Sequence, residues 1–525
     1  QSSAQMYEDI KEMDPFLYSK IRKFIYDGRW IPIGGTWVES DCNIPSGESL
    51  VRQFLYGKRF FMKEYGEDIK IAWFPDTFGY PWTLPKIMKS VGIEFFLTTK
   101  LTWNEFNDFP YEQFLWIGDD GSEIKAMNAL GYTNKLTVEE IYKHWKWHNK
   151  KSKNPFSVLI FGYGDGGGGP TEEMIKAYDV LKEFPKIPEI VMKNPKDEFL
   201  SINDLPIWDD ELYLEFHRGT YTTLSDIKKY NRKAEFALYT LELVLTMEKV
   251  LEGLGYPKDE IEKMWKTLLK HQFHDVLPGS SIKEVYGVAI NELKMIIEKS
   301  QRLIEKGIKV LAKAEEGSGR LIVFNPHPFP VELDLIMEKP IFKSLKIMGR
   351  VIPSQDIFDS KVIFRDPDII LNPFSINVFE ASEEISTLES DLKVKDNFVE
   401  NEFYKIEINR NGSIKIKYKD KEVFNEEGNI LVVCEDIPRN WDAWDVQYDV
   451  EKKCEKIIFE NVELVSSGPH AIIYKLVGMY NKSKIEQFIF IRSRSRRIDF
   501  ITRVDWKEKR KILKVLFPVN LRSKW

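Results

Sequence analysis

The chain has 525 residues, of which 43% are hydrophobic and 30% are charged. This balance is typical of soluble globular proteins, and the length is enough for about three domains. The formal net charge of -6 gives no reason to expect nucleic acid as a partner. No apolar run approaches the roughly 20 residues that a membrane helix needs.

The cysteines and the chain ends lead to two further expectations. Cys42, Cys434 and Cys454 are odd in number and scattered, so no disulfide framework is predicted and a reducing, cytoplasmic compartment is favoured. No signal peptide or transit segment is visible. The chain begins with Gln1 rather than Met, directly before a helical pattern, and it stops just after a strand-like run at 515–520. We therefore expect a fragment of a longer protein.

Residues 1–185 alternate between helical and strand-like patterns, within a first domain predicted over residues 1–221. The predicted helices are 14–27, 49–64, 82–91 and 171–184, and the predicted strands are 28–33, 69–73, 94–98 and 158–161. Such alternation indicates an α/β domain with a parallel sheet, barrel-like or open. In these folds the site residues follow the carboxyl ends of the strands, which is where Asp76 and the loop 162–170 stand.

The rest of the chain changes character twice. Residues 222–315 contain three long helical patterns, at 224–250, 258–272 and 283–314, which predict a three-helix bundle. Residues 316–319 indicate a linker. From Arg320 onward, short β-like runs separated by turn signals predict a β-sandwich domain over 316–525, incomplete at its C-terminal end.

The first motif is Trp73-Phe-Pro-Asp-Thr-Phe-Gly-Tyr80, which places Asp76 directly after a short apolar run. A carboxylate at the end of a strand can attack a sugar carbon or ligate a metal. The alternative is that Asp76 caps the helix that begins near Pro81, as aspartates commonly do. Asp76 stands too early for this cap and lies between aromatic residues, which favours the functional interpretation.

The second motif is the glycine-rich run Gly162-Tyr-Gly-Asp-Gly-Gly-Gly-Gly-Pro-Thr171. It suggests a backbone that a substrate can approach closely, with Asp165 as an acid/base. A phosphate loop is a weak alternative because the Gly-Lys-Ser/Thr ending is absent. A plain turn before a helix capped by Thr171 explains four consecutive glycines poorly, since glycine loses much conformational entropy on folding.

The third motif is His271-Gln-Phe-His-Asp-Val-Leu-Pro-Gly-Ser280, at the end of a predicted helix. His271 and His274 are spaced to share one side of a helix, and each alone could equally be a core histidine. The adjacent Asp275 and the helix-ending Pro278-Gly279 favour His274 as a metal ligand.

Three weaker patterns also fit ordinary structural roles. His144 and His148 have the spacing of a zinc helix, but Trp145 stands where a metalloprotease glutamate would be, so a solvated amphipathic helix is predicted. His217 and Arg218 end a strand-like run and either line a cleft or simply end the strand. The arginine-rich stretch 492–497 is interpreted as an exposed turn and strand edge rather than a nucleic-acid patch.

Together these residues resemble the class II α-mannosidases, glycoside hydrolase family 38, especially the bacterial, archaeal and cytosolic branch. The resemblance spans nearly the whole chain, and several motifs together make it specific. The matching segments are 35–41, 45–53, 73–80, 162–171, 211–223, 271–280, 325–328 and 441–445, with 497–500 matching more loosely.

The resemblance implies retaining hydrolysis of terminal α-mannosides with one divalent metal, usually zinc. It makes Asp76 the nucleophile and a metal ligand, and His274 a second ligand. Asp165 is the acid/base candidate, although some relatives carry two adjacent aspartates where this chain has Asp165-Gly166. Lys100 lies where some relatives carry a sugar-contacting arginine. Asp275 resembles a sugar-binding carboxylate.

The resemblance also implies what the chain lacks. The family's other two metal ligands, a His and an Asp, come from a strand near the start of the catalytic domain, and this chain begins downstream of that strand. The chain alone is therefore expected to bind zinc weakly and to be inactive. In the intact protein, Phe74, Phe78 and Tyr80 are expected to form apolar walls for the sugar.

Two other functions remain open at this point. A metal-dependent carbohydrate deacetylase is another α/β protein with Asp and His ligands, and it would release acetate with a metal-bound water. A glycan-binding protein without catalysis is the other alternative. The expected partner is a mannoside or an oligosaccharide, and a homo-oligomer is compatible with the sequence.

Overall fold

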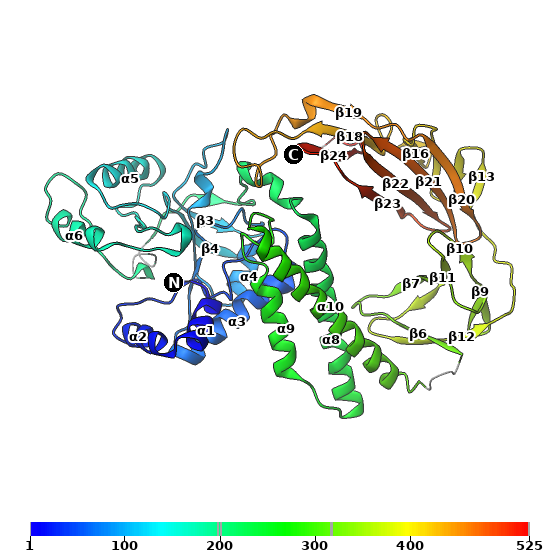
Figure 1. The fold of residues 1–525 in the computed structure, drawn as a ribbon, viewed down its shortest axis with the longest axis horizontal. Coiled ribbons are helices and arrows are strands. Elements are labelled where there is room, and N and C mark those ends of the chain that lie inside the picture. Colours follow the sequence, from blue (N-terminus) through cyan, green and yellow to red (C-terminus); the bar gives the residue numbers. More distant parts are fainter. Residues whose placement is uncertain (1, 197–198, 200–201, 315–318, 523–525) are drawn as a thin grey trace. The chain divides into compact units, whose positions relative to one another are not determined.

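The computed structural model describes residues 2–196, 199, 202–314 and 319–522 (Figure 1). Most of the predicted linker 316–319 thus lies outside the described residues. The chain forms two compact units. The first contains Gln1–Glu242, Pro257–Arg302 and Asn440–Val446, and the second contains Leu243–Tyr256, Leu303–Arg439 and Gln447–Trp525. None of the helices in the described ranges combines the length and the apolar character needed to cross a bilayer.

The first unit begins with helices whose ends follow from local sequence. Asp14 caps α2 (Pro15–Tyr26) by accepting from the Leu17 amide, with proline at the first helical position. Ser46 caps α3 in the same way, and Gly66 ends that helix in the left-handed conformation, with φ 74°. The other helices here are α1 (Ala4–Met13), α3 (Gly47–Tyr65) and α4 (Leu84–Ser90).

A five-stranded sheet in the order β1-β2-β4-β3-β5 lies at the centre of this unit. Its strands are β1 (Ile71–Trp73), β2 (Phe95–Thr98), β3 (Gln113–Ile117), β4 (Glu123–Asn128) and β5 (Ile207–Trp208). β1, β2 and β4 are parallel, which confirms the predicted α/β class, whereas β3 runs antiparallel to β4. The register pairs Ala72 with Phe96, so the residues after β1 and after β2 emerge at the same edge.

Two predicted strands are wrong. Residues 28–33 form turns and irregular structure, and Gly34 donates a single hydrogen bond to the Ile71 carbonyl. Residues 158–161 are also irregular, with one parallel bridge between Asn134 and Phe161. Both runs are apolar, and in each case the side chains pack against the sheet although the backbone does not pair as a strand: Ile33, Val158 and Ile160 belong to one core cluster.

Helix α5 (Val138–Lys151) corrects a second expectation, because His144 and His148 are buried rather than solvated. His148 Nδ1 contacts the buried Glu112 carboxylate, and His144 Nε2 lies 2.5 Å from Ser157 Oγ. Glu112 and Ser157 come from outside the helix, so the helical pattern alone could not reveal this burial. Other helical segments of the unit include α6 (Glu172–Leu181), η1 (Lys100–Thr102), η2 (Asp165–Gly167) and η3 (Glu215–Tyr221).

The three predicted long helices are confirmed as α8 (Ser225–Glu252), α9 (Lys258–Lys270) and α10 (Lys283–Leu311). Within the first unit, side-chain hydrogen bonds join these helices. Trp265 Nε1 of α9 donates to Glu242 of α8 at 3.1 Å, and His271 Nε2, after α9, lies 2.5 Å from Glu292 of α10.

The second unit is built from antiparallel sheets, which confirms the predicted β region. Its N-terminal strands are β6 (Arg320–Phe324), β7 (Val331–Glu338), β8 (Ser344–Ile347), β9 (Arg350–Pro353), β10 (Gln355–Asp356), β11 (Lys361–Leu371) and β12 (Ile376–Ser382). They form the sheets β10-β11-β7 and β6-β12-β8-β9. A core cluster that includes Leu333, Phe364 and Phe379 fills the space among them.

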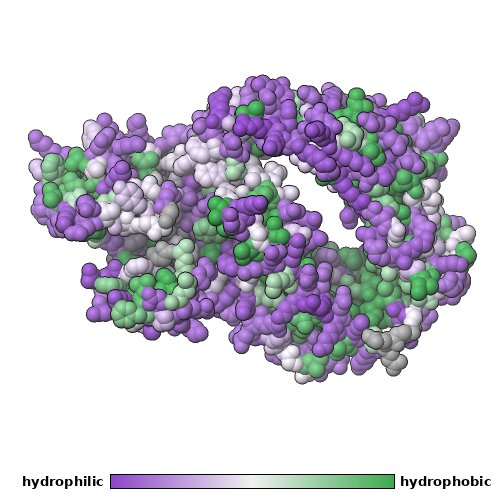
Figure 2. Space-filling view, viewed as in Figure 1, coloured by the Kyte–Doolittle hydropathy of each residue, from purple (hydrophilic) through white to green (hydrophobic). Residues whose placement is uncertain are grey.

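The remaining strands form three more sheets, β13-β14-β15-β16-β17, β19-β18-β24 and β20-β21-β22-β23. Their bounds are β13 (Lys393–Lys395), β14 (Phe398–Glu400), β15 (Tyr404–Ile408), β16 (Ile414–Tyr418), β17 (Lys421–Glu422), β18 (Ile430–Glu435), β19 (Cys454–Lys456), β20 (Asn461–Ser467), β21 (Ala471–Tyr480), β22 (Ser483–Arg492), β23 (Ile498–Asp505) and β24 (Lys511–Leu516), with η4 (Val450–Lys453) before β19. In the view of Figure 2, hydrophilic residues cover most of the surface.

Two details of this unit correct the sequence analysis. Cys434 and Cys454 are disulfide-bonded, because the antiparallel register of β18 and β19 places them directly opposite each other. Cys42 is a buried free thiol. The cysteine count therefore no longer argues for a reducing compartment. In the stretch 492–497, Arg492 is buried and contacts Asp334 and Asp499, and Arg497 contacts Asp499, so carboxylates neutralise the predicted exposed edge.

Candidate active site

Two hydrogen bonds donated by backbone amides hold Asp76 at the carboxyl end of β1. The Phe74 amide donates to the Leu97 carbonyl at 2.9 Å, which extends the pairing with β2, and the Asp76 amide donates to Glu39 Oε1 at 2.7 Å. Helix α4 begins at Leu84 with Thr83 at its N-cap position. Asp76 is therefore not the cap of that helix, and its side chain is left for another role.

The nearest cation to Asp76 is Lys100, which begins η1 directly after β2. Its Nζ lies 2.5 Å from Asp76 Oδ1, and the lysine side chain is only 2% exposed. The ammonium also lies 4.4 Å from the ring centre of Trp103, 5.4 Å from that of Phe78 and 5.5 Å from that of Trp444. A cation this deeply buried needs a counter-charge, which Asp76 provides.

The electrostatics keep Asp76 ionised. Burial alone would raise its pKa, but the hydrogen bond to His274 and the charge of Lys100 overcome burial and lower the pKa to about 2. An ionised carboxylate can act as a nucleophile or as a metal ligand at neutral pH.

His274 and Asp275 reach the same point from the loop after α9. His274 Nδ1 lies 3.0 Å from the Glu39 carbonyl oxygen, which leaves Nε2 facing the carboxylates, 3.5 Å from Asp76 Oδ2 and 3.7 Å from Asp275 Oδ2. Ser280 Oγ donates to Asp275 Oδ1 at 2.8 Å. Burial opposes a charge on His274, but the carboxylates of Glu39, Asp76 and Asp275 raise its pKa to about 9.

These three side chains fit a divalent metal. One ligand atom from each of Asp76, His274 and Asp275 lies within 4.8 Å of the others. Imidazole nitrogen and carboxylate oxygen are ligands that zinc accepts. Metal-bound histidines usually donate their other ring N–H to a carbonyl or carboxylate, as Nδ1 of His274 is placed to do at Glu39. Asp275, predicted from the resemblance to bind sugar, thus also lies within reach of the metal position.

Asp165 lies in η2 and is exposed, and its partner is Tyr132, a residue that the sequence analysis missed. The Tyr132 hydroxyl donates to Asp165 Oδ1 at 2.8 Å. Burial, followed by the charges of Asp76 and Asp165, raises the pKa of Tyr132 well above its ordinary value. Tyr132 therefore stays protonated and donates to Asp165.

Backbone conformation and close contacts account for two of the glycines around Asp165. Gly162 has φ 120°, and a Cβ at Gly164 would lie 2.9 Å from the Tyr132 ring. The small residue at 164 thus lets Tyr132 approach the Asp165 loop, which explains part of the run without invoking flexibility.

The predicted apolar walls divide into two groups. Phe74 and Tyr80 are each 1% exposed in the core cluster of the sheet, and the Tyr80 hydroxyl donates to the Phe74 carbonyl at 2.8 Å. Phe78 is the predicted aromatic residue that lies beside Lys100, and it stacks on His217 with ring centres 4.4 Å apart. The structure brings Phe78 to the site and leaves Phe74 and Tyr80 as packing residues.

The sequence allows His217 either to line a cleft or to end a strand, and in the structure its ring lies among the aromatic residues beside Lys100, which form an aromatic wall. Its ring stacks between Phe78 and Trp444, at 4.4 and 5.1 Å, and both ring nitrogens are buried without a hydrogen-bond partner in the described residues. Burial and the charge of Lys100 lower its pKa to about 3, although Asp76 opposes this, so the imidazole is neutral.

Comparison with known proteins identifies the family of the chain. The glycosyl hydrolases family 38 N-terminal domain matches residues 1–211, the alpha mannosidase middle domain matches residues 215–311, and the glycosyl hydrolases family 38 C-terminal domain matches residues 399–524. The chain belongs to glycosyl hydrolase family 38.

Two curated relatives of this family 38 chain cover it almost completely. Alpha-mannosidase 2C1 of Homo sapiens is 33% identical over 544 residues, covering 99% of this chain and 50% of that protein. Alpha-mannosidase G of Dictyostelium discoideum is 32% identical over 578 residues, covering 100% of this chain and 53% of that protein. The chain thus spans about half the length of the curated relatives it matches.

A solved structure shows the same fold. The alpha-mannosidase from Enterococcus faecalis V583 has a TM-score of 0.80 and 17% identity, covering 100% of this chain and 70% of that chain. At this identity the likeness concerns the fold of the family 38 chain alone.

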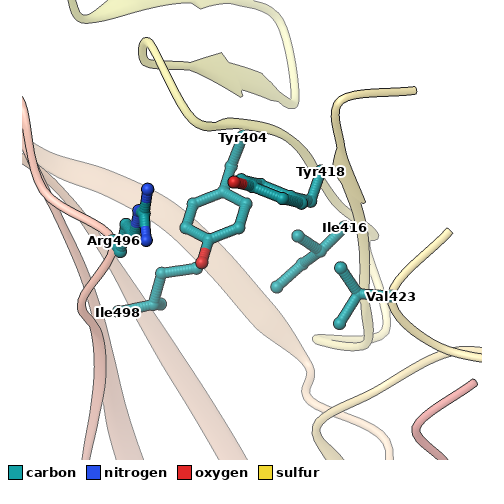
Figure 3. Close-up of a pocket in the computed structure, with 6 residues that line it drawn as sticks. All are labelled: Tyr404, Ile416, Tyr418, Val423, Arg496 and Ile498. Atoms are coloured by element: carbon teal, nitrogen blue, oxygen red, sulfur yellow. The ribbon is translucent and has the colours of Figure 1, made fainter. Parts of the chain in front are cut away.

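Two cavities of the family 38 chain are lined by residues outside this charged site. One of about 390 Å³ in the second unit is lined by Tyr404, Ile416, Tyr418, Val423, Arg496 and Ile498, without a carboxylate (Figure 3). Another of about 720 Å³ in the first unit lies along α5 and the segment 155–161, and it is mostly apolar. Neither lining includes Asp76 or His274. The candidate active site is therefore located by the charged residues Asp76, Lys100 and His274, and not by either cavity.

Proposed function

We propose that this chain carries the active site of a retaining α-mannosidase that uses a divalent metal, with zinc as the metal. The observation that supports it most is the convergence of Lys100 and His274 on one ionised carboxylate, Asp76. Both curated relatives described above are named as alpha-mannosidases. The substrate is a terminal α-mannoside, alone or at the end of an oligosaccharide, and a cytoplasmic location belongs to the same proposal.

In the proposed reaction, Asp76 attacks the anomeric carbon while Asp165 gives a proton to the leaving oxygen. Asp165 then takes a proton from water, which releases mannose from Asp76 with overall retention of configuration. Lys100 keeps Asp76 ionised and fixes its orientation, and Tyr132 holds the Asp165 side chain by the 2.8 Å hydrogen bond. A metal held by Asp76 and His274, with Asp275 beside them, would bind sugar hydroxyls and orient the ring.

The test is the stereochemistry of hydrolysis. An aryl α-mannoside is added to the intact protein with zinc, and proton NMR follows the anomeric signal of the first mannose released. We expect α-mannose first, before mutarotation. Release of β-mannose would exclude the double displacement. Release of acetate from an acetylated sugar, without mannoside cleavage, would favour a carbohydrate deacetylase, and sugar binding without any product would favour a glycan-binding protein.

A further inference from the structure

A segment distant in sequence completes the aromatic wall beside Lys100. Residues Asn440–Val446 belong to the first unit, although the chain on either side belongs to the second. Two bonds fasten the segment to the end of η3: the Gly219 amide donates to the Trp444 carbonyl at 2.7 Å, and Thr223 Oγ1 donates to the Ala443 carbonyl at 3.0 Å. A Cβ at Gly219 would lie 2.8 Å from that same carbonyl oxygen, so the glycine permits the contact.

The two tryptophans of this segment have different environments. Trp444 is partly buried and faces the site, with its ring centre 5.6 Å from that of Phe78 and 5.5 Å from Lys100 Nζ. Trp441 is 39% exposed and extends the wall outward, where it contacts Trp103 at 5.1 Å and Phe216 at 4.9 Å. The planes of Trp441 and Trp444 differ by only 29°. The wall is thus continuous from the ionised carboxylate to an exposed indole face.

The backbone of Trp441 is unusual for so large a side chain. Its φ is +55°, and it is held there by a tight turn in which the amides of Trp444 and Asp445 both donate to the Trp441 carbonyl, at 2.9 and 3.0 Å. Left-handed backbone conformations are unfavourable for bulky residues and cluster at ligand-binding sites. The turn thus holds an indole ring that is 39% exposed.

We propose that Trp441, supported by Trp103 and Phe216, binds the second sugar ring of the substrate, the hexose on the leaving-group side of the scissile bond. This inference rests on the proposed function, because it places the cleaved mannose at Asp76 and Lys100. A hexose has one face of C–H groups that packs on an indole plane. Its hydroxyls can still form hydrogen bonds with water or with the exposed Asp442, which follows Trp441 in the chain. A continuous wall from Asp76 to Trp441 places this ring next to the cleaved one.

The test uses two ligands that differ by one ring, methyl α-mannoside and a sulfur-linked α-mannobiose that resists hydrolysis. Affinities are measured calorimetrically for the zinc-loaded protein, Trp441→Ala, Trp441→Tyr and Trp30→Ala. Trp30 is 36% exposed and serves as the matched control for loss of a surface indole. We expect Trp441→Ala to lower the affinity for the disaccharide about ten-fold and to change the affinity for methyl α-mannoside by less than about two-fold. The reason is that tryptophan contacts buried by a ligand often dominate binding. Trp441→Tyr should retain most of the affinity, and Trp30→Ala should retain all of it.

Two results would overturn the inference while hydrolysis of simple mannosides persists. In one, Trp441→Ala binds the disaccharide as tightly as the unchanged protein does. In the other, it loses both ligands equally, which would mean that the segment acts through the structure of the wall. If the unchanged protein neither binds nor cleaves any mannoside, the proposed function fails first and the inference fails with it.

Discussion

The ammonium group of Lys100 lies 2.5 Å from Oδ1 of Asp76, inside a cage of three aromatic rings. The two residues follow adjacent parallel strands, β1 and β2, whose register places their carboxyl ends side by side. The Lys100 side chain is only 2% exposed and that of Asp76 is 20% exposed, so removal of either one leaves a charge that is largely out of water and lacks its partner. The pair therefore links the stability of the site to its chemistry.

Lys100→Met is expected to lower both activity and stability. The Asp76 carboxylate would lose its nearest cation, so its pKa should rise from about 2 toward the ordinary range, and the free energy of unfolding should fall by about 3–5 kcal/mol, as for other broken buried pairs. Lys100→Arg keeps the charge and should retain most turnover. Chemical denaturation and the acid limb of the pH–kcat profile measure the two effects. An unchanged acid limb in Lys100→Met would show that Lys100 does not control Asp76.

Asp76→Asn is expected to lower kcat by about three orders of magnitude or more, because the covalent nucleophile is lost. It should also destabilise the fold, since Lys100 becomes the unpaired charge. Combining Asp76→Asn with Lys100→Met separates the two roles, because the double variant removes both charges. It should recover most of the stability and none of the activity. Turnover above a tenth of the unchanged rate in Asp76→Asn would end its assignment as nucleophile.

Asp165→Ala should affect substrates according to their leaving groups. A poor leaving group needs the proton that Asp165 supplies, whereas dinitrophenolate leaves without one. We expect a large loss of kcat/KM with mannobiose, a small loss with the dinitrophenyl mannoside, and partial recovery with added azide. Tyr132→Phe is the companion variant, because it removes the 2.8 Å bond to Asp165 and should give a weaker version of the same pattern. Equal losses for both substrates, with no effect of azide, would assign the acid/base to another carboxylate.

The sequence was sufficient for residues that stand in short, recognisable motifs. Asp76, His274 and Asp275 stand in compact motifs, and the predicted helix–strand alternation placed Asp76 at a sheet edge. Other features depend on contacts between distant segments. The burial of His148 depends on Glu112, and the Cys434–Cys454 bond depends on the register of two antiparallel strands. Trp444 reaches Lys100 from the far end of the chain, and no local spacing indicates that contact.

Zinc binding should depend on His274. The described part of the chain brings one imidazole and two carboxylates together, and removal of the imidazole leaves a site that zinc holds poorly. We expect His274→Ala to lower the affinity for zinc by orders of magnitude. The affinity is measured as bound metal after dialysis at controlled free zinc. His271→Gln is the control, since His271 lies three residues away and bonds to Glu292 instead. Equal zinc binding in His274→Ala and in the unchanged protein would show that His274 is not a ligand.

Acid should destabilise the first unit through its buried neutral histidines, and His144 gives the clearest case. Burial lowers its pKa to about 4, and the charge on His148 adds to the effect. In the unfolded chain its pKa is about 6.5. Between these values the unfolded state binds a proton that the folded state does not, so stability falls as the pH drops from 6.5 toward 4. The contribution is fully present above pH 6.5 and is lost as the pH falls through about 4.

His144→Gln should reduce this dependence. Glutamine can still bond to Ser157 Oγ but cannot take up the proton, so the slope of unfolding free energy against pH should decrease by up to about 1.4 kcal/mol per pH unit within that window. Urea denaturation at half-unit steps between pH 4.5 and 7 measures the slope, with the exposed His327→Gln as control. If both variants keep the slope of the unchanged protein, protonation of His144 is not what limits stability in acid.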